Sequence, residues 1–146
     1  MATGVQIVEC DADLKRRVGE VMGEVAENHI RLEDGFAYVA LDGDTPVGII
    51  AVYRRRLPAP LPETYEGFIN IIEVADSHRR CGLGRRLVAM SVERCRKQGL
   101  RQVRAWSSED RTAALSMWKA LGFALCPATE HPRGVEVKGY FVALPL

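Results

Sequence analysis

The chain has 146 residues, with 20 Lys and Arg against 19 Asp and Glu, which gives a formal net charge of +1. Its 47% apolar and 27% charged residues exclude a disordered chain, and the length fits a single domain over residues 1–146 with a full apolar core. A near-zero net charge gives no general attraction to nucleic acid or to an anionic membrane, so neither is predicted as a partner.

The N-terminal half predicts a strand, a helix and a β-hairpin. Either Asp11 or Asp13 is suited to cap the helix, because its side chain accepts an N–H group of the first turn. An apolar stripe at helical spacing follows, formed by Leu14, Val18, Val21, Met22 and Val25. The predicted strands are Gly4–Glu9, Phe36–Leu41 and Val47–Tyr53, with turn residues at 42–44 joining the last two.

The middle and C-terminal segments predict alternating strands and helices. Arg54–Glu63 contains Pro58, Pro60 and Pro62 and is expected to be a loop, either a substrate-facing flap or a plain surface loop. Ser108 or Asp110 is expected to open a helix that ends at Gly122. The remaining predicted elements are the strand Phe68–Val74, the helix Arg85–Gln98 with Met90 on its apolar side, and the strands Gln102–Trp106, Phe123–Cys126 and Val135–Leu144.

The order of these elements is β-α-β-β-β-α-β-α-β-β. Such an order predicts an α/β (α+β) fold in which helices flank one central, mixed sheet.

The four cysteines indicate neither disulfides nor a metal site. They form no C-x-x-C pair, and the pairs Cys81 with His78 and Cys126 with His131 fall short of the three or four ligands that zinc needs. No apolar run resembles a signal peptide or approaches the ~18 residues of a membrane span. We therefore expect a cytoplasmic protein with reduced thiols and no metal.

Charge is distributed unevenly along the chain. Residues 1–50 hold ten acidic and four basic side chains, whereas residues 79–104 hold nine basic and one acidic. The basic block surrounds a loop, Ser77–Gly84, that leads from an apolar strand directly into a helix. Helix N-termini have unpaired N–H groups and a partial positive charge, so they bind phosphate. Because Gly82 and Gly84 let the backbone approach a ligand closely, the loop is predicted to cradle a pyrophosphate.

Two common phosphate-binding motifs do not fit this loop. The chain has no G-x-x-x-x-G-K-[ST] sequence, which excludes a P-loop. A dinucleotide fingerprint needs G-x-G-x-x-G, but Leu87 stands at the third glycine position, and no acidic residue follows about 20 residues later.

The pattern R-x-x-G-x-G, from Arg79 to Gly84, resembles the acyl-CoA signature of the GNAT family of N-acetyltransferases. A second segment, Met117–Phe123, resembles the end of that family's signature N-x-x-A-x-x-x-Y-x-x-L-G-F. The element order also agrees, so the resemblance covers essentially the whole chain. It implies a protein that transfers the acetyl group of acetyl-CoA to a primary amine of a small molecule or a peptide.

The resemblance also assigns roles to individual residues. It implies that backbone N–H groups of the loop hold the CoA pyrophosphate, that the strand holding Ile72 and Val74 pairs with the pantetheine arm, and that this strand and the next splay apart. The Val74 N–H would polarise the thioester oxygen. The implied cofactor-binding residues are Ile72, Val74, Arg79, Arg80, Cys81, Gly82, Leu83, Gly84, Arg85, Arg111 and Trp118.

Two positions depart from the family pattern. Arg111 stands where Asn is frequent, and Trp118 stands where the family has the Tyr proposed to protonate the leaving thiolate. An indole N–H is not an acid at neutral pH, so either another group donates the proton or none is needed. Trp118 is expected to be a core residue or to pack against the pantetheine. The candidate donors by position are Ser107, Ser108 and Tyr140.

Glu73 is the first candidate for the general base, because it is an acid in an otherwise apolar central strand, where burial would raise its pKa. The alternative is that Glu73 pairs with an arginine, and Glu66 is the second candidate. Cys81 is a less suitable nucleophile, since only His78 is near it in the sequence.

Other functions and partners remain open at this stage. The basic block also fits a nucleic-acid-binding module built on the Arg85–Lys97 helix, and the missing Tyr fits a CoA-binding regulatory domain without turnover. The acceptor is expected to contact the first helix, the Arg54–Glu63 loop and the Cys126–Val137 loop, where the acidic N-terminal third would attract a cationic amine. The apolar last strand is a candidate for pairing across a homodimer.

Overall fold

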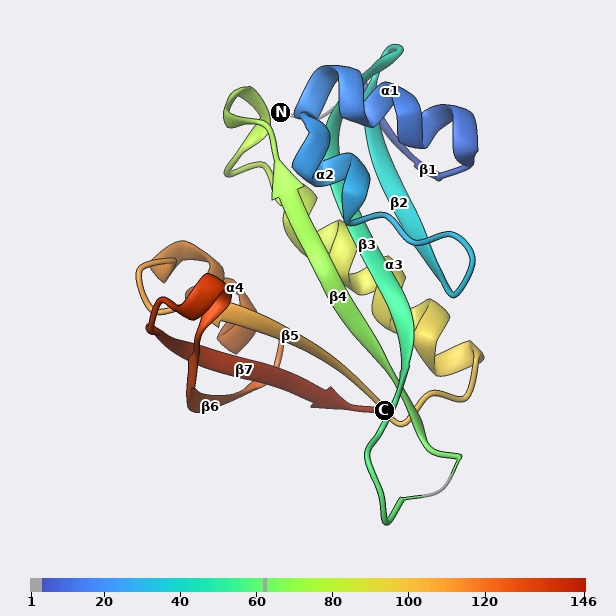
Figure 1. Cartoon of the computed structure of the whole chain (residues 1–146). Helices are drawn as coiled ribbons and strands as arrows, with labels where there is room; N and C mark the ends of the chain where they lie inside the picture. The colour runs from blue at the N-terminus through green and yellow to red at the C-terminus, as the bar shows by residue number, and fades with distance from the viewer. Residues whose placement is uncertain (1–3, 62) are drawn as a thin grey trace.

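The computed structural model describes residues 4–61 and 63–146, so the expectation for Pro62 lies outside the described residues. One seven-stranded sheet has the order β1-β2-β3-β4-β5-β7-β6 and is antiparallel except between β4 and β5. The predicted α/β fold is confirmed (Figure 1). The strands are β1 (Val5–Glu9), β2 (Gly35–Asp42), β3 (Thr45–Arg56), β4 (Tyr65–Val74), β5 (Gln102–Ser108), β6 (Ala124–Glu130) and β7 (Val137–Pro145). The α-helices are α1 (Ala12–Met22), α2 (Glu24–Asn28), α3 (Leu83–Lys97) and α4 (Thr112–Ala120).

Two apolar clusters fill the space on either side of the sheet. One lies beneath α1 and α2, which cover the face turned to the viewer in Figure 1, and the other lies beneath α3, behind the sheet. Leu14 and Val18 of α1 belong to the first cluster, and Leu87 of α3 and Trp118 of α4 belong to the second. The sheet is therefore a scaffold covered on both faces, as the element order predicts.

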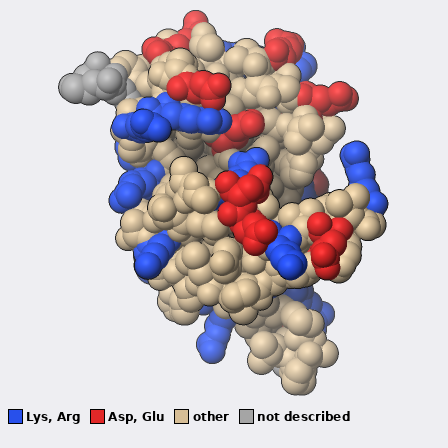
Figure 2. All heavy atoms as spheres, turned by 90° about the vertical axis from the view of Figure 1, so that its left-hand side faces the viewer, with Lys and Arg blue, Asp and Glu red and all other residues tan. Residues whose placement is uncertain are grey.

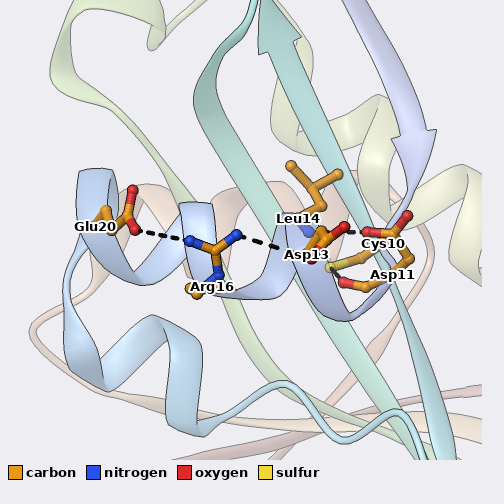
Figure 3. A network of polar contacts seen from close by, with 6 residues as sticks. All are labelled: Cys10, Asp11, Asp13, Leu14, Arg16 and Glu20. Carbon is orange, nitrogen blue, oxygen red and sulfur yellow. Dashed lines mark hydrogen bonds and ion pairs between the residues drawn. The ribbon is translucent and has the colours of Figure 1, made fainter.

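The N-terminus of α1 shows which aspartate caps the helix. The Asp11 carboxylate accepts a hydrogen bond of 2.8 Å from the Leu14 N–H (Figure 3). Asp13 lies in the first turn of the helix and pairs instead with Arg16, at 3.8 Å. Arg16 also pairs with Glu20, at 3.4 Å, and both of these ion pairs are solvent-exposed. The cap fixes where the helix begins, whereas the exposed pairs contribute little to its stability.

The predicted apolar stripe of the first helix is confirmed only in part. Gly23 has φ +106° and ends α1, and a new helix, α2, begins at Glu24. Because the break changes the direction of the chain, residues beyond it no longer continue the stripe of α1. Val21 and Val25 are 53% and 68% exposed, so the prediction that they belong to the core is wrong.

Two further local predictions need correction. Neither Ser108 nor Asp110 caps α4, because β5 extends to Ser108 and Arg111 occupies the N-cap position without a side-chain cap. The Ser108 hydroxyl instead donates to Asp110, at 2.5 Å. On α3, Met90 is 36% exposed rather than buried.

The proline-containing loop lies far from the predicted pyrophosphate loop. Its described residues, 57–61 and 63–64, lie between β3 and β4 at the lower end of Figure 1. Val74 stands at the opposite end of β4, about 30 Å away at the usual rise of a strand. Surface hollows of about 460 and 650 Å³ also lie at the lower end, lined in part by Arg56 and by Tyr65. This position favours the plain surface loop over the flap.

The last strand, β7, lies inside the sheet. It pairs with β5 on one side and with β6 on the other, so both of its edges are used. The predicted pairing of this strand across a homodimer is therefore wrong. The edge strand at this end of the sheet is β6.

Strands β4 and β5 meet at one end and separate at the other. Their pairing consists of Gly67 with Val103 and Phe68 with Arg104, after which the strands diverge (Figure 1). Beyond this point β4 carries an extra residue, Asn70, that has no partner in the register with β3. Such a bulge bends a strand. The splaying implied by the family resemblance is confirmed, and it leaves the upper part of β4 with an open edge.

Candidate active site

The loop between β4 and α3 presents a run of unpaired backbone N–H groups. Within the described residues, those of residues 80–85 have no hydrogen-bond acceptor, and the first bond of the helix runs from the Arg86 N–H to the Gly82 carbonyl, at 3.1 Å. Gly82 is the N-cap and provides no side-chain cap. These groups, together with the dipole of a 15-residue helix, form a positive cradle.

The shape of this loop depends on left-handed backbone conformations. Gly82 has φ +79° and Arg80 has φ +62°. A Cβ atom at Gly82 would touch nothing within 4 Å, so the backbone angle rather than crowding requires glycine there. At Gly84, a Cβ atom would lie 3.4 Å from the Met117 sulfur of α4. Glycine therefore leaves the mouth of the cradle open.

Arginines around the loop fall into two groups. Arg79 donates from Nε to the Val74 carbonyl at 3.0 Å and pairs with Asp76 at 3.0 Å, so it braces the loop. Arg80 and Arg85 are exposed and have no carboxylate partner among the described residues. In the view of Figure 2, which looks toward the side on which β4 and β5 diverge, blue and red side chains are mixed rather than separated. The cations available to a phosphate are therefore a few residues beside the loop, not the whole basic block.

The upper part of β4 has unpaired main-chain groups along its open edge. The Ala75 N–H bonds to the Val47 carbonyl of β3, at 2.8 Å. Because successive residues of a strand point their main-chain groups to opposite sides, those of Ile72 and Val74 face the diverging β5. Pairing with β5 has already ended at Phe68, so this edge is able to bind an extended chain as an additional strand.

Six of the predicted cofactor residues are partly or fully buried, namely Ile72, Val74, Cys81, Leu83, Gly84 and Trp118. Leu83 is 1% exposed and Trp118 is 2% exposed, and Trp118 packs against Phe123 with ring centroids 4.9 Å apart. Cys81 is half-buried, and its thiol donates to the His78 carbonyl at 2.7 Å. Leu83 is thus able to offer a ligand only its backbone, and the placement of Trp118 favours its core role. Arg111 is exposed at the N-terminus of α4.

The two candidate bases differ sharply in their surroundings. Glu73 is exposed, so the argument that burial prepares it as a base is wrong, and it forms no ion pair among the described residues. Glu66 is 0% exposed. It accepts hydrogen bonds from Gln102 and Arg104 and forms an ion pair with Arg55. A buried carboxylate that accepts these contacts is not available to take a proton from a substrate. Glu73 is therefore the accessible acid of β4.

The three candidate proton donors also differ in their surroundings. Ser107 is 6% exposed and lies opposite Tyr140, which is half-buried in the cluster beneath α3. Ser108 is committed to Asp110. None of the three has a position that distinguishes it as an acid.

Sequence reasoning missed a contact that anchors the loop. His78 bonds through Nε2 to Asp42, at 2.8 Å, and through Nδ1 to Ser77, at 2.7 Å. The Asp42 contact ties the loop after β4 to the turn between β2 and β3, which is 36 residues away in the sequence. A pairing over that separation has no local pattern, so sequence rules cannot predict it.

Neither a metal-binding cluster nor a membrane-spanning helix is found among the described residues. No group of three or more His, Cys, Asp or Glu is arranged to hold a metal ion, within residues 4–61 and 63–146. No helix in this part of the chain is long and apolar enough to cross a membrane.

A sequence model of the Acetyltransferase (GNAT) family matches residues 9–123. The chain belongs to the GNAT acetyltransferase family. No curated protein sequence matches it. Its backbone is similar to that of Arabidopsis thaliana NAA60 in complex with acetyl-CoA, with a TM-score of 0.81 and 12% identity over 97% of this chain and 99% of that chain.

Two other solved structures resemble this GNAT protein to a similar degree. The Escherichia coli ribosomal-protein-S18-alanine N-acetyltransferase has a TM-score of 0.75 and 14% identity, over 97% of this chain and 93% of that one. A chain of the NatC complex bound to Gag peptide and CoA has a TM-score of 0.73 and 14% identity, over 97% and 99%. At these identities, the likeness shows a shared fold.

Proposed function

We propose that the protein is an acetyl-CoA-dependent N-acetyltransferase that transfers the acetyl group directly to a primary amine of a small molecule or a peptide. The observation that carries the proposal is the run of unpaired N–H groups at residues 80–85 beside the open edge of β4. A pyrophosphate fits the first feature and an extended pantetheine fits the second. Family membership and the acetyl-CoA and CoA complexes of similar structures support this ligand. A cytoplasmic location is part of the proposal.

Each end of the cofactor would contact different groups of this chain. The loop N–H groups, with Arg80 and Arg85, would bind the phosphates, while Arg79 holds the loop against Val74. The main-chain groups of Ile72 would pair with the pantetheine, while the Val74 carbonyl keeps its bond to Arg79. The Val74 N–H would then donate a hydrogen bond to the thioester oxygen and stabilise the negative charge that develops there.

Acetyl-CoA supplies an activated acyl group, and the protein must supply a neutral amine. Glu73 is proposed to take the proton from the ammonium group through an ordered water, because it is the accessible carboxylate on this strand. The amine nitrogen then bonds to the acetyl carbon as the carbon–sulfur bond breaks, and the CoA thiolate leaves with the electron pair. The positively charged amide nitrogen loses its extra proton to solvent. No proton donor is assigned, because Trp118 is buried and is not an acid.

The proposal is tested by incubating the protein with acetyl-CoA and a panel of amines, and by measuring the released thiol and the mass of each amine. The panel contains polyamines, aminoglycosides, amino acids and peptides with free N-termini. Peptides are included because two similar structures are of proteins described with a ribosomal-protein or peptide partner. Thiol release matched by a mass increase of one acetyl group is the expected result. Release without an acetylated amine would contradict the proposal.

A CoA-binding domain without turnover is the second candidate, and the burial of Trp118 at the position of the family's Tyr favours it. This candidate predicts CoA binding with no acetylated product from any amine in the panel. The nucleic-acid alternative loses support, because Arg94 and Arg96 of α3 are paired with Glu9 and Glu93.

A further inference from the structure

The two halves of the sheet are joined by very few main-chain contacts. Strand β4 pairs with β3 over nearly its whole length, and β5 pairs with β7 over all seven of its residues. Between β4 and β5 there are two residue pairs, Gly67 with Val103 and Phe68 with Arg104, and a hydrogen bond of 2.8 Å from the Arg101 N–H to the Tyr65 carbonyl. We call this short junction the vertex. The angle between the halves therefore needs support from side chains.

A buried carboxylate lies at the vertex and bonds to both halves. Glu66 of β4 is 0% exposed. From β5, Arg104 donates to it from Nε at 3.0 Å and from Nη2 at 2.9 Å, and Gln102 donates at 2.8 Å. From β3, the Arg55 Nε lies 3.1 Å from Glu66 Oε2, the oxygen that also accepts from Arg104 Nη2. Three of these four contacts cross the vertex, and the fourth does not.

Aromatic rings extend the connection into the next strand. The Arg104 guanidinium lies 4.9 Å from the centre of the Phe141 ring of β7 and 5.7 Å from that of Phe68 of β4. One side chain thus contacts β4 and β7 while it is bonded to Glu66. A planar, two-pronged guanidinium holds such an arrangement more rigidly than an ammonium group would.

The geometry points to Glu66 as a positioning residue that, through Arg104 and Gln102, sets the separation of β4 and β5 and so the width of the slot for the pantetheine arm. This inference rests on the proposed function for the identity of the ligand. The pyrophosphate loop lies at the other end of β4 and has its own braces, at Arg79 and His78. Loosening the vertex should therefore weaken binding of the pantetheine arm and leave binding of the phosphates unchanged.

Two matched variants test this inference. Arg104→Gln and Arg55→Gln each remove one positive charge and leave Glu66 one guanidinium partner, but only the first removes contacts across the vertex. Calorimetry would measure the affinity for CoA and for adenosine 3′,5′-bisphosphate, which lacks the pantetheine arm. We expect Arg104→Gln to bind CoA about tenfold more weakly, because small displacements of a positioned ligand cost affinity steeply. Its affinity for the bisphosphate, and both affinities of Arg55→Gln, should equal those of the wild type.

Amide hydrogen exchange of the free protein gives a second readout that needs no ligand. Arg104→Gln should speed exchange at the vertex, residues 67–68 and 103–104, while Arg55→Gln should not. The inference would be overturned if Arg104→Gln weakened the binding of CoA and of the bisphosphate equally. It would also be overturned if the two variants had equal effects in either measurement. A wild-type protein that binds neither ligand would instead refute the proposed function, and the exchange measurement would still decide the role of the vertex.

Discussion

The two ends of β4 are built in opposite ways. At its N-terminal end, the vertex, Glu66 is fully buried and bonded on several sides by charged and polar side chains. At its C-terminal end, the main-chain groups of Ile72 and Val74 face an open edge, and the following loop has unpaired N–H groups. The closed end uses side chains to hold the protein together, and the open end keeps its backbone available for a ligand. If the proposed function holds, a ligand with an extended arm and a pyrophosphate would be recognised mainly by main-chain geometry.

The sharpest test of the open end is a charge placed in the cradle. Gly82→Glu should weaken CoA binding by at least about 100-fold, because it adds strain at φ +79° and a negative charge where the phosphates would lie. Isothermal calorimetry would measure the affinity. Gly99→Glu is the matched control, since Gly99 has φ +74° and open space at the other end of α3. Equal loss of affinity in both variants would show that the cradle is not the binding site.

The accessible acid on β4 should matter for turnover rather than for cofactor binding. Glu73→Gln is expected to lower kcat about 100-fold, which is the usual size of a general-base contribution, with CoA affinity unchanged. Steady-state rates with an accepted amine, measured across pH, would check this. If kcat stays within about twofold of the wild type, Glu73 is not the base.

At the closed end, loss of the buried charge should lower stability. Glu66→Gln is expected to reduce the free energy of unfolding by about 3 kcal/mol, because it leaves two guanidinium groups without their carboxylate. Glu9→Gln, which removes the exposed partner of Arg94, should cost less than about 1 kcal/mol. Urea unfolding of both variants gives the comparison, and similar losses would contradict the special role of the vertex.

The unpaired cations at the open end should act on the phosphates alone. Arg80→Gln together with Arg85→Gln is expected to weaken CoA binding about tenfold, as expected for the loss of charge-assisted hydrogen bonds to an anion. Arg96→Gln, whose side chain pairs with Glu93, is the control and should leave the affinity unchanged. An affinity for S-acetylpantetheine that falls in parallel would contradict this division of roles.

The last effect appears only at alkaline pH and concerns the closed end. Cys95 packs behind the vertex, close to Gly67, and burial raises its pKa to about 11 from 9.0. The folded state then keeps a proton that the unfolded state loses, so this contribution to stability is complete below pH 9 and is lost as pH rises toward 11. The unfolding free energy of the wild type should fall over this range more steeply than that of Cys95→Ala. Parallel curves would contradict the assignment.

The sequence predicted the open end better than the closed end, for physical reasons. The strand, the glycines and the helix after them follow one another along the chain, so local rules place them together. The network of Glu66 joins residues 36 and 38 positions apart and has no local pattern. Glu73 was expected to be buried because its neighbours are apolar, but its side chain is exposed on one face of the strand.

The error in the first helix has an equally specific cause. Val25 continues the stripe of α1 only if the helix is unbroken, and Gly23, with φ +106°, interrupts it, whereas Val21 lies within α1 on its exposed side. The acidic N-terminal third also provides a weaker field than its composition suggests. Several of its acids are paired with arginines, among them Asp13, Asp34 and Glu9. A preference for cationic amines is therefore not supported by charge alone.

Amide hydrogen exchange with and without CoA tests the central claim most directly, because it reports on the backbone itself. We predict new protection at Ile72, Val74 and residues 80–85, with no change at Gly67 and Phe68, which are already paired. Protection confined to another surface, or none at saturating CoA, would contradict the assignment of the open end of β4 as the cofactor site.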